Sequence, residues 1–120
     1  VCTGVRVSMG RLRIDAAAST LPVQICRSFA ARLRGYGPVR RAEAGVWLEP
    51  CAAVHTLWPW HPIDVVFVAR GGRVLRVCSD LRPGRLRWSA GARAVLELPA
   101  GSCAVHAIRV GGHLEVRHGD

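Results

Sequence analysis

The residues of this chain that could do chemistry are concentrated in one short stretch, Pro50–Val68, which reads PCAAVHTLWPWHPIDVVFV. Cys51 and His55 are four residues apart, His61 follows six residues later, and Asp64 lies three residues after that. Zinc takes thiolate, imidazole and carboxylate ligands in a tetrahedron, so these residue types could bind a metal. The same types could also supply a nucleophile, a base and an orienting acid for covalent catalysis.

The spacing of these residues does not favour a metal site. In an extended strand Cys51 and His55 share a face, but the prolines of the stretch redirect the chain around His61. We therefore expect no bound metal and no cofactor. A purely structural role is the simpler interpretation, in which Cys51 packs in the core and His55 bonds Thr56 or the backbone. Asp64, which precedes an apolar strand, would then cap a loop by accepting backbone N–H bonds.

An enzymatic role is the alternative that the sequence leaves open. Cys51 or Cys78 with His55 and Asp64 could form a nucleophile, base and orienter. The sequence contains no nucleophile elbow and no glycine-rich oxyanion loop, so a hydrolase of a familiar type is not indicated. Catalysis by this group would require His55 and Asp64 to converge with a thiol or His61 in a pocket that solvent reaches.

A binding surface is the interpretation that the sequence favours. Trp58 and Trp60 stand among prolines and predict a stiff aromatic loop, and a second segment, RPGRLRW, combines arginines with Trp88. Aromatic residues and arginine are the usual anchors of binding interfaces. We predict a module without catalytic activity that binds a ligand or a protein. The candidate site loop comprises Cys51, His55, Thr56, Trp58, Trp60, His61 and Asp64, and the candidate basic surface comprises Arg82, Arg85 and Arg87.

Composition and charge narrow the class of partner. The 120 residues are half hydrophobic, which excludes a disordered chain, and they have the length of a single domain, 1–120. Arginine supplies all 17 basic residues, and the formal net charge is +9. This charge favours an anionic partner. Nucleic acid, with bases stacked on tryptophan, is a further alternative. The arginine-only composition is also typical of a GC-rich genome, which lowers the weight of that count.

Cysteine usage and the absence of targeting patterns indicate a cellular compartment. The five cysteines are widely spaced and form no Cys-x-x-Cys pair, which is typical neither of a disulfide framework nor of a zinc ribbon. The chain has no apolar core of the signal-peptide type, and no run approaches ~18 apolar residues, so we expect no membrane span. We expect a soluble, cytoplasmic protein, and whether a leader precedes Val1 stays open.

Short apolar segments bounded by glycine and proline predict a mainly β (α+β) domain. Strands are expected over 5–14, as one bent strand or a pair, and over 45–49 and 92–98. The segment 15–26 should be a turn that leads to a short strand, and 109–118 should be a glycine turn followed by a final short strand. A helix is expected over 27–36, and Ser102 is expected to cap one or two further helical turns. A small curled sheet or barrel-like domain with one or two short helices fits this order of elements.

The clearest element is a hairpin in IDVVFVARGGRVLRVCSDL, around Gly71 and Gly72. Two glycines between apolar runs are typical of a two-residue turn. The first strand is apolar on both faces, so it should lie centrally in its sheet with both faces covered. With the glycines at the centre of the turn, the facing pairs should be Val68 with Leu75, Val66 with Val77, and Val65 with Cys78.

The ordered series RLRGYG, GVWLEPCAAVHT, HPIDVVFVARGGRVLRV, RAVLELPAG and RVGGHLEV resembles the domain-of-unknown-function 192 family of small bacterial and archaeal proteins. The resemblance covers about 27–116 and includes a Cys-x-x-Val-His-Thr motif that is typical of one branch. It implies a compact β-rich fold and supplies no activity. The chain departs from the family pattern at Pro59, where a methionine is usual, and at Gly112, where an aspartate closes a Gly-Asp turn. A family function that needs either residue would be altered here.

Overall fold

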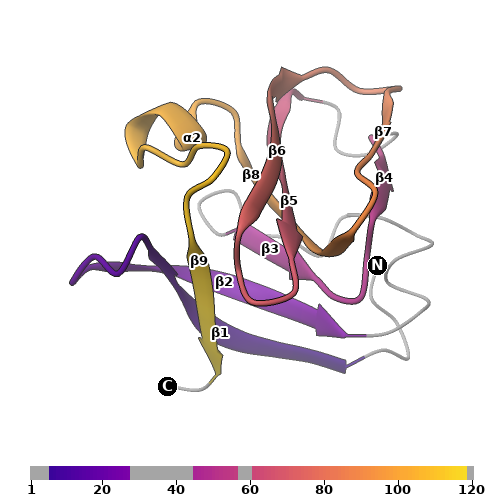
Figure 1. Ribbon diagram of the computed structural model, residues 1–120. Coiled ribbons are helices and arrows are strands. Elements are labelled where there is room, and N and C mark those ends of the chain that lie inside the picture. Colours follow the sequence, from indigo (N-terminus) through magenta and orange to yellow (C-terminus); the bar gives the residue numbers. More distant parts are fainter. Residues whose placement is uncertain (1–5, 28–44, 57–60, 119–120) are drawn as a thin grey trace.

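The computed structural model describes residues 6–27, 45–56 and 61–118, and within these ranges the chain is mainly β (Figure 1). The sheet-forming pattern of alternating and β-branched apolar residues gives short, twisted strands connected by glycine-rich turns. The elements in chain order are β1 Arg6–Ile14, β2 Thr20–Arg27, β3 Gly45–Leu48, β4 Ala53–His55, β5 Ile63–Ala69, β6 Val74–Leu81, β7 Leu86–Trp88, β8 Ala92–Pro99, α2 Ser102–Val105 and β9 Leu114–His118.

Seven of these strands form one curled sheet in the order β6-β5-β8-β3-β2-β1-β9. Its two edge strands meet at one point, because Arg73 before β6 bridges His113 before β9. The Val74 N–H donates to the Gly112 carbonyl at 2.9 Å, and the Leu114 N–H donates to the Gly72 carbonyl at 2.8 Å. The sheet is therefore a half-barrel closed at the β5–β6 turn (Figure 1), which confirms the expected curled, barrel-like fold.

Each face of this sheet packs a separate core. All seven strands contribute to the inner cluster, which includes Leu12, Ile25 and Leu96 and also receives Cys103 of α2. The outer cluster is built around Phe67 from β2, β3, β5, β6 and β8, and residues 51 and 54 also belong to it. The central strand β5 is buried on both faces, as its continuous apolar run predicted.

A small two-stranded ribbon covers part of the outer face. In this ribbon β4 pairs antiparallel with β7, and Ala53, Val54 and His55 lie opposite Trp88, Arg87 and Leu86. Val54 is buried in the outer core, whereas Ala53 and His55 are exposed. Successive side chains alternate between the two sides of a strand, so the ribbon has an inner side against the sheet and an outer side toward solvent.

The hairpin register is confirmed at two of its three expected pairs. Val66 lies opposite Val77 and Val65 opposite Cys78, as expected. The third expectation was wrong, since Val68 lies opposite Val74 and not Leu75. A register shift between Phe67 and Val68 and a longer turn, in which the Ala69 N–H donates to the Arg73 carbonyl, account for the difference.

Two helix expectations have different outcomes. The expected helix at 27–36 lies outside the described residues except for Arg27, which is the last residue of β2. The later helical turn exists as α2, but Ser102 does not cap it. The N-cap is Gly101 in the left-handed region, and the Ser102 hydroxyl donates backwards to the Pro99 carbonyl at 2.6 Å. Ser102 is not needed as a cap, because the Asp64 carboxylate on β5 already accepts the N–H groups of Gly101 and Cys103.

Gly72 and Gly71 provide a matched test of how the half-barrel closes. Both have positive φ, but a Cβ at Gly72 would collide with the Leu114 carbonyl and approach the His113 ring, whereas a Cβ at Gly71 meets nothing within 4 Å. We expect Gly71→Ala to lower the free energy of unfolding by about 1–2 kcal/mol through backbone strain alone. Gly72→Ala should lower it clearly further. Urea denaturation of both variants measures this, and equal losses would contradict the closure.

Candidate functional site

Asp64 is the buried charged residue around which the candidate site is built. It lies on β5 with its side chain completely excluded from solvent. Its Oδ1 accepts the Asp80 N–H at 2.8 Å, and its Oδ2 accepts the N–H groups of Gly101 at 3.1 Å and Cys103 at 2.9 Å. Three backbone donors replace the water that a carboxylate needs. Asp64 thus joins the end of β6 and the α2 turn to β5.

The alternation of β5 explains why this side chain faces that turn. Ile63 and Val65 belong to the outer core, so Asp64 and Val66 are directed to the inner side of the half-barrel, where Cys103 of α2 packs. The pairing of β5 with β6 shifts register between Ile63 and Val65, which leaves room for the carboxylate to reach the Asp80 amide. The expected loop-capping role of Asp64 matches this arrangement.

Cys103 is the thiol that contacts this carboxylate. Burial raises the pKa of the Cys103 thiol from 9.0 to about 12, and the negative charge of Asp64 and a side-chain hydrogen bond to it add to the rise. The thiolate is the nucleophilic and metal-binding form of cysteine. At neutral pH Cys103 is therefore a protonated donor to Asp64 and a poor nucleophile.

Thr56 and Cys51 also serve the backbone. The Thr56 hydroxyl lies 2.8 Å from the Arg82 carbonyl and 3.1 Å from the Arg85 carbonyl, and it accepts the Arg85 N–H at 2.8 Å. The Thr56 backbone adds two further bonds to the same turn. Cys51 is buried, and its thiol donates to the Ala53 carbonyl at 3.1 Å. Thr56 thus holds the turn that carries two of the predicted basic residues.

The remaining members of the candidate site loop are exposed or lie outside the described residues. His55 is exposed on β4, opposite Leu86. His61 is exposed, with its Nδ1 atom 3.1 Å from the Pro62 carbonyl. Trp58 and Trp60 lie outside the described residues, so the predicted aromatic loop stays a prediction.

The structure does not bring the chemical residues of this loop together. Within 6–27, 45–56 and 61–118, no three His, Cys, Asp or Glu side chains are grouped so that they could hold a metal ion. Asp64 is buried and faces backbone amides, whereas His55 is exposed on the ribbon. Asp64 is therefore not exposed to solvent at a pocket that it could share with His55.

The outer side of the ribbon offers a different kind of site. Ala53, His55, Leu86 and Trp88 are all exposed there, with Leu86 at 53% and Trp88 at 61% of their full surface. We call these four residues the ribbon face. Directly opposed residues lie on the same side of an antiparallel pair, so Trp88 is the cross-strand neighbour of Ala53, and Leu86 is that of His55. Exposed large apolar side chains next to one another are typical of a contact surface.

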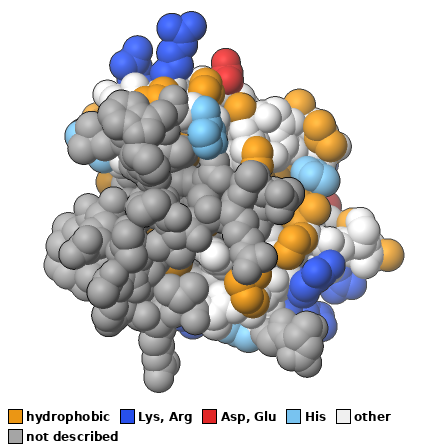
Figure 2. Space-filling model, turned by 180° about the vertical axis from the view of Figure 1, so that it is seen from behind, with side chains coloured by type: hydrophobic (Ala, Val, Ile, Leu, Met, Phe, Trp, Pro, Cys, Tyr) orange, Lys and Arg blue, Asp and Glu red, His pale blue; other side chains and the backbone are white. Residues whose placement is uncertain are grey.

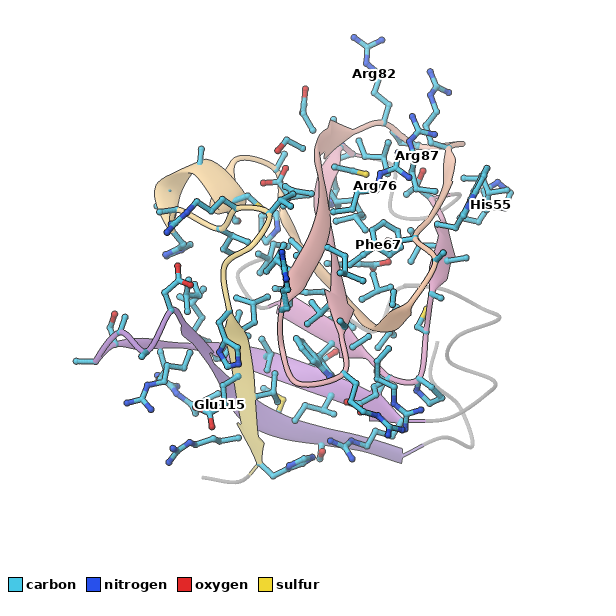
Figure 3. The ribbon with its side chains drawn as sticks, in the orientation of Figure 1. His55, Phe67, Arg76, Arg82, Arg87 and Glu115 are labelled. Carbon is cyan, nitrogen blue, oxygen red and sulfur yellow. The ribbon has the colours of Figure 1, made fainter. Side chains whose placement is uncertain are left out.

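Arginines border the ribbon face. Arg82 and Arg85 are exposed in the turn that Thr56 holds, and Figure 3 shows Arg76, Arg82 and Arg87 at the same end of the molecule as His55. The Arg76 guanidinium donates to the Trp88 carbonyl at 2.7 Å, and that of Arg87 to the Leu86 carbonyl at 2.8 Å. Figure 2 shows Arg side chains projecting from this upper edge.

The sequence analysis found three of these arginines and missed Arg76 and Leu86. Residues 70–93 contain seven arginines and one acid, Asp80, and this local imbalance was the available signal. The pairing of β4 with β7 joins His55 to the segment with Leu86 and Trp88, which lies about thirty residues further along the chain. The spacing of residues within either segment could not predict that His55 and Leu86 are neighbours.

The fold and these motifs belong to a known family. The model of the family DUF192, described as "Uncharacterized ACR", matches residues 11–116, so the chain is a member of that family. The match extends the resemblance seen in the sequence toward the N-terminus. The finer assignment, to a branch with the Cys-x-x-Val-His-Thr motif, stays a prediction. No curated protein matches the sequence.

Two crystal structures have the same fold. One, a "putative transcription regulator" from Sinorhizobium meliloti, is 20% identical, has a TM-score of 0.77, and the alignment covers 92% of this chain and 95% of that one. The other, a protein of unknown function from Novosphingobium aromaticivorans, is 21% identical, has a TM-score of 0.73, and the alignment covers 94% of this chain and 87% of that one. At these identities the similarity shows the fold alone. Among the described residues, no helix is long and apolar enough to cross a membrane.

Replacing Asp64 tests its structural role. Asp64→Ala removes the acceptor of three backbone N–H groups, of which that of Cys103 is buried and those of Asp80 and Gly101 are partly buried. A buried N–H group without an acceptor costs about 1–3 kcal/mol, so we expect a loss of at least about 1 kcal/mol in the free energy of unfolding. Asp64→Asn keeps one acceptor oxygen and should lose less. Asp80→Asn, an exposed change at a left-handed position that asparagine tolerates, is the control. Urea denaturation gives the three values, and a stable, well-folded Asp64→Ala variant would refute the role.

The Cys103 thiol should make stability depend on alkaline pH. Its pKa is raised in the folded protein, so the folded state holds a proton that the unfolded state loses above 9.0. The contribution of the Cys103 thiol to the free energy of unfolding is therefore complete below pH 9.0 and is lost as the pH rises toward about 12. We expect the stability difference between wild type and Cys103→Ala to shrink over that window in denaturant titrations. A difference that stays constant with pH would contradict the raised pKa.

Proposed function

We propose that the protein is a binding module without catalytic activity of its own, and that the ribbon face and its arginine border bind an anionic partner. The observation that carries the proposal is the exposure of Trp88 and Leu86 beside His55 within a border of arginines. An apolar centre with a charged rim is the usual composition of an interface. The buried residues of the Cys51–Asp64 loop would then hold this surface in place.

The charges of the border support an anionic partner. Arg82 and Arg85 are exposed, whereas the guanidinium groups of Arg76 and Arg87 bond backbone carbonyls of β7. A backbone carbonyl does not cancel the charge of a guanidinium, so all four arginines contribute to a positive potential over the ribbon. With a net charge of +9, the whole molecule would also attract a polyanion over long range, and added salt would weaken this attraction.

Single-stranded nucleic acid is the partner class that a specific observation favours. In Arg85-Leu86-Arg87-Trp88 a cation alternates with an apolar side chain, and the indole of Trp88 is exposed. Stacking of a base on such a ring and contacts of arginine with phosphates are the two main terms of single-strand binding. The description of the Sinorhizobium meliloti structure as a "putative transcription regulator" is consistent with this class of partner.

The cytoplasm is the location that we propose for this module. Cys78 and Cys103 are free thiols. Free thiols persist in a reducing compartment, whereas secreted domains of this size often use disulfides.

Binding to two labelled polyanions tests the proposal. Fluorescence anisotropy would follow a single-stranded oligonucleotide and poly-glutamate against wild type, Trp88→Ala and the double variant Arg82→Gln/Arg85→Gln. Arg117→Gln is the control, since Arg117 is an exposed arginine of β9, away from the ribbon (Figure 1). Loss of one base stack costs about 1–3 kcal/mol, so Trp88→Ala should weaken oligonucleotide binding by about tenfold, and the control should change it little.

The two probes separate the outcomes. Oligonucleotide binding that needs Trp88 and falls with salt supports a nucleic-acid partner. Binding of poly-glutamate alone supports an acidic protein and rejects nucleic acid. Binding of neither probe, or equal losses in the ribbon variants and Arg117→Gln, would overturn the proposed surface.

A further inference from the structure

A cavity opens at one end of the half-barrel, where the β5–β6 turn meets β9. It measures about 460 Å³, which is within the range of small-molecule sites, and the mouths of β-barrels are a common place for such sites. The apolar lining includes Trp47, Ala94 and Leu114, all of them buried. The polar lining comes from Arg27, Glu49, Arg70, Arg93, His113 and Glu115.

Glu49 organises one wall of this cavity. The indole N–H of Trp47 donates to Glu49 Oε1 at 2.8 Å and fixes the carboxylate. Arg27 Nη2 lies 3.7 Å from Oε1, and Arg93 Nε lies 3.6 Å from Oε2. These distances are those of ion pairs and exceed the length of a hydrogen bond. Glu49 therefore holds both guanidinium groups near the cavity without using their N–H donors, which a bound anion could engage.

The β5–β6 turn and the start of β9 form the opposite wall. His113 Nε2 lies 2.7 Å from the Gly71 carbonyl, so this nitrogen must carry a proton and donate it. Arg70 belongs to the same turn and lines the cavity. Glu115 forms ion pairs with Arg13 at 3.6 Å and Arg117 at 3.8 Å, so its charge is balanced by arginines that do not line this cavity. Arginines from both walls thus line one cavity.

We propose that this cavity binds a small organic anion, which places a carboxylate or phosphate group between Arg27, Arg93 and Arg70 and a short apolar body against Trp47 and Leu114. Guanidinium forks match the oxygen spacing of both anions and form charge-assisted hydrogen bonds with them. The buried apolar surface supplies the second half of the recognition. This inference goes beyond the proposed function and does not depend on it, because no residue of the ribbon face lines the cavity.

Titration with simple probes tests the inference on the full chain. Sodium benzoate, inorganic phosphate and neutral benzamide would be added at constant ionic strength, up to about 10 mM, which covers millimolar affinities. Amide resonances of Gly71, Gly72 and His113 in ¹H–¹⁵N NMR spectra would report binding. Arg27→Gln/Arg93→Gln is the test variant, and Arg82→Gln on the ribbon is the control. A thermal melt of each variant establishes that it is folded.

We expect saturable shifts at the cavity with benzoate, none with benzamide, and an affinity reduced about tenfold or more in Arg27→Gln/Arg93→Gln, but unchanged in Arg82→Gln. Saturation by phosphate but not by benzoate would support phosphate as the anionic group and overturn the carboxylate. Shifts that do not saturate, or that fall equally in the control, would show general attraction to a basic protein and overturn the site. If the double variant is unfolded, Arg70→Gln gives the same comparison.

Discussion

The fold depends on one buried carboxylate. A fully buried aspartate is unfavourable unless donors replace its hydration, and here three backbone N–H groups from two segments do so. Asp64 satisfies amides of the α2 turn that have no partner within so short a helix. The protonated thiol of Cys103 donates to the same carboxylate. One side chain on the central strand thereby fixes the connection between β8 and β9, and with it the approach of β9 to the β5–β6 turn.

A second polar residue positions the surface that we consider functional. Thr56 makes the turn at 82–85 rigid through its hydroxyl and its backbone, and this turn carries Arg82 and Arg85 beside the ribbon. The polar residues of the Cys51–Asp64 stretch therefore act mainly within the protein, and the side chains that they position face the solvent. Because these polar residues bond the protein's own backbone, they can lie close together in sequence without forming an active site.

The sequence predicted those features that depend on local pattern. The apolar run 63–69 and the glycines that follow it indicated the central hairpin, and the capping role of Asp64 followed from its place before a buried strand. The register shift after Phe67 was not predicted, because it depends on the length of the turn that Ala69 and Arg73 close. The missing cap at Ser102 could not be predicted, because the amides of that turn bond Asp64, which is distant in sequence. The same holds for the neighbourhood of His55 and Leu86, and for Glu49, whose partners Arg27 and Arg93 come from two other strands. Residue spacing contains no information on such contacts.

The most direct test of this account is hydrogen exchange at the amides that Asp64 accepts. In the free protein, the N–H groups of Asp80, Gly101 and Cys103 should exchange as slowly as those of the core strands, because they open only when β5 separates from the end of β6 or from the α2 turn. The amide of Ala104, which is exposed in α2, provides the internal reference for fast exchange. Exchange of the three amides at the rate of Ala104 would contradict the central claim, since Asp64 would then be a side chain available for other chemistry.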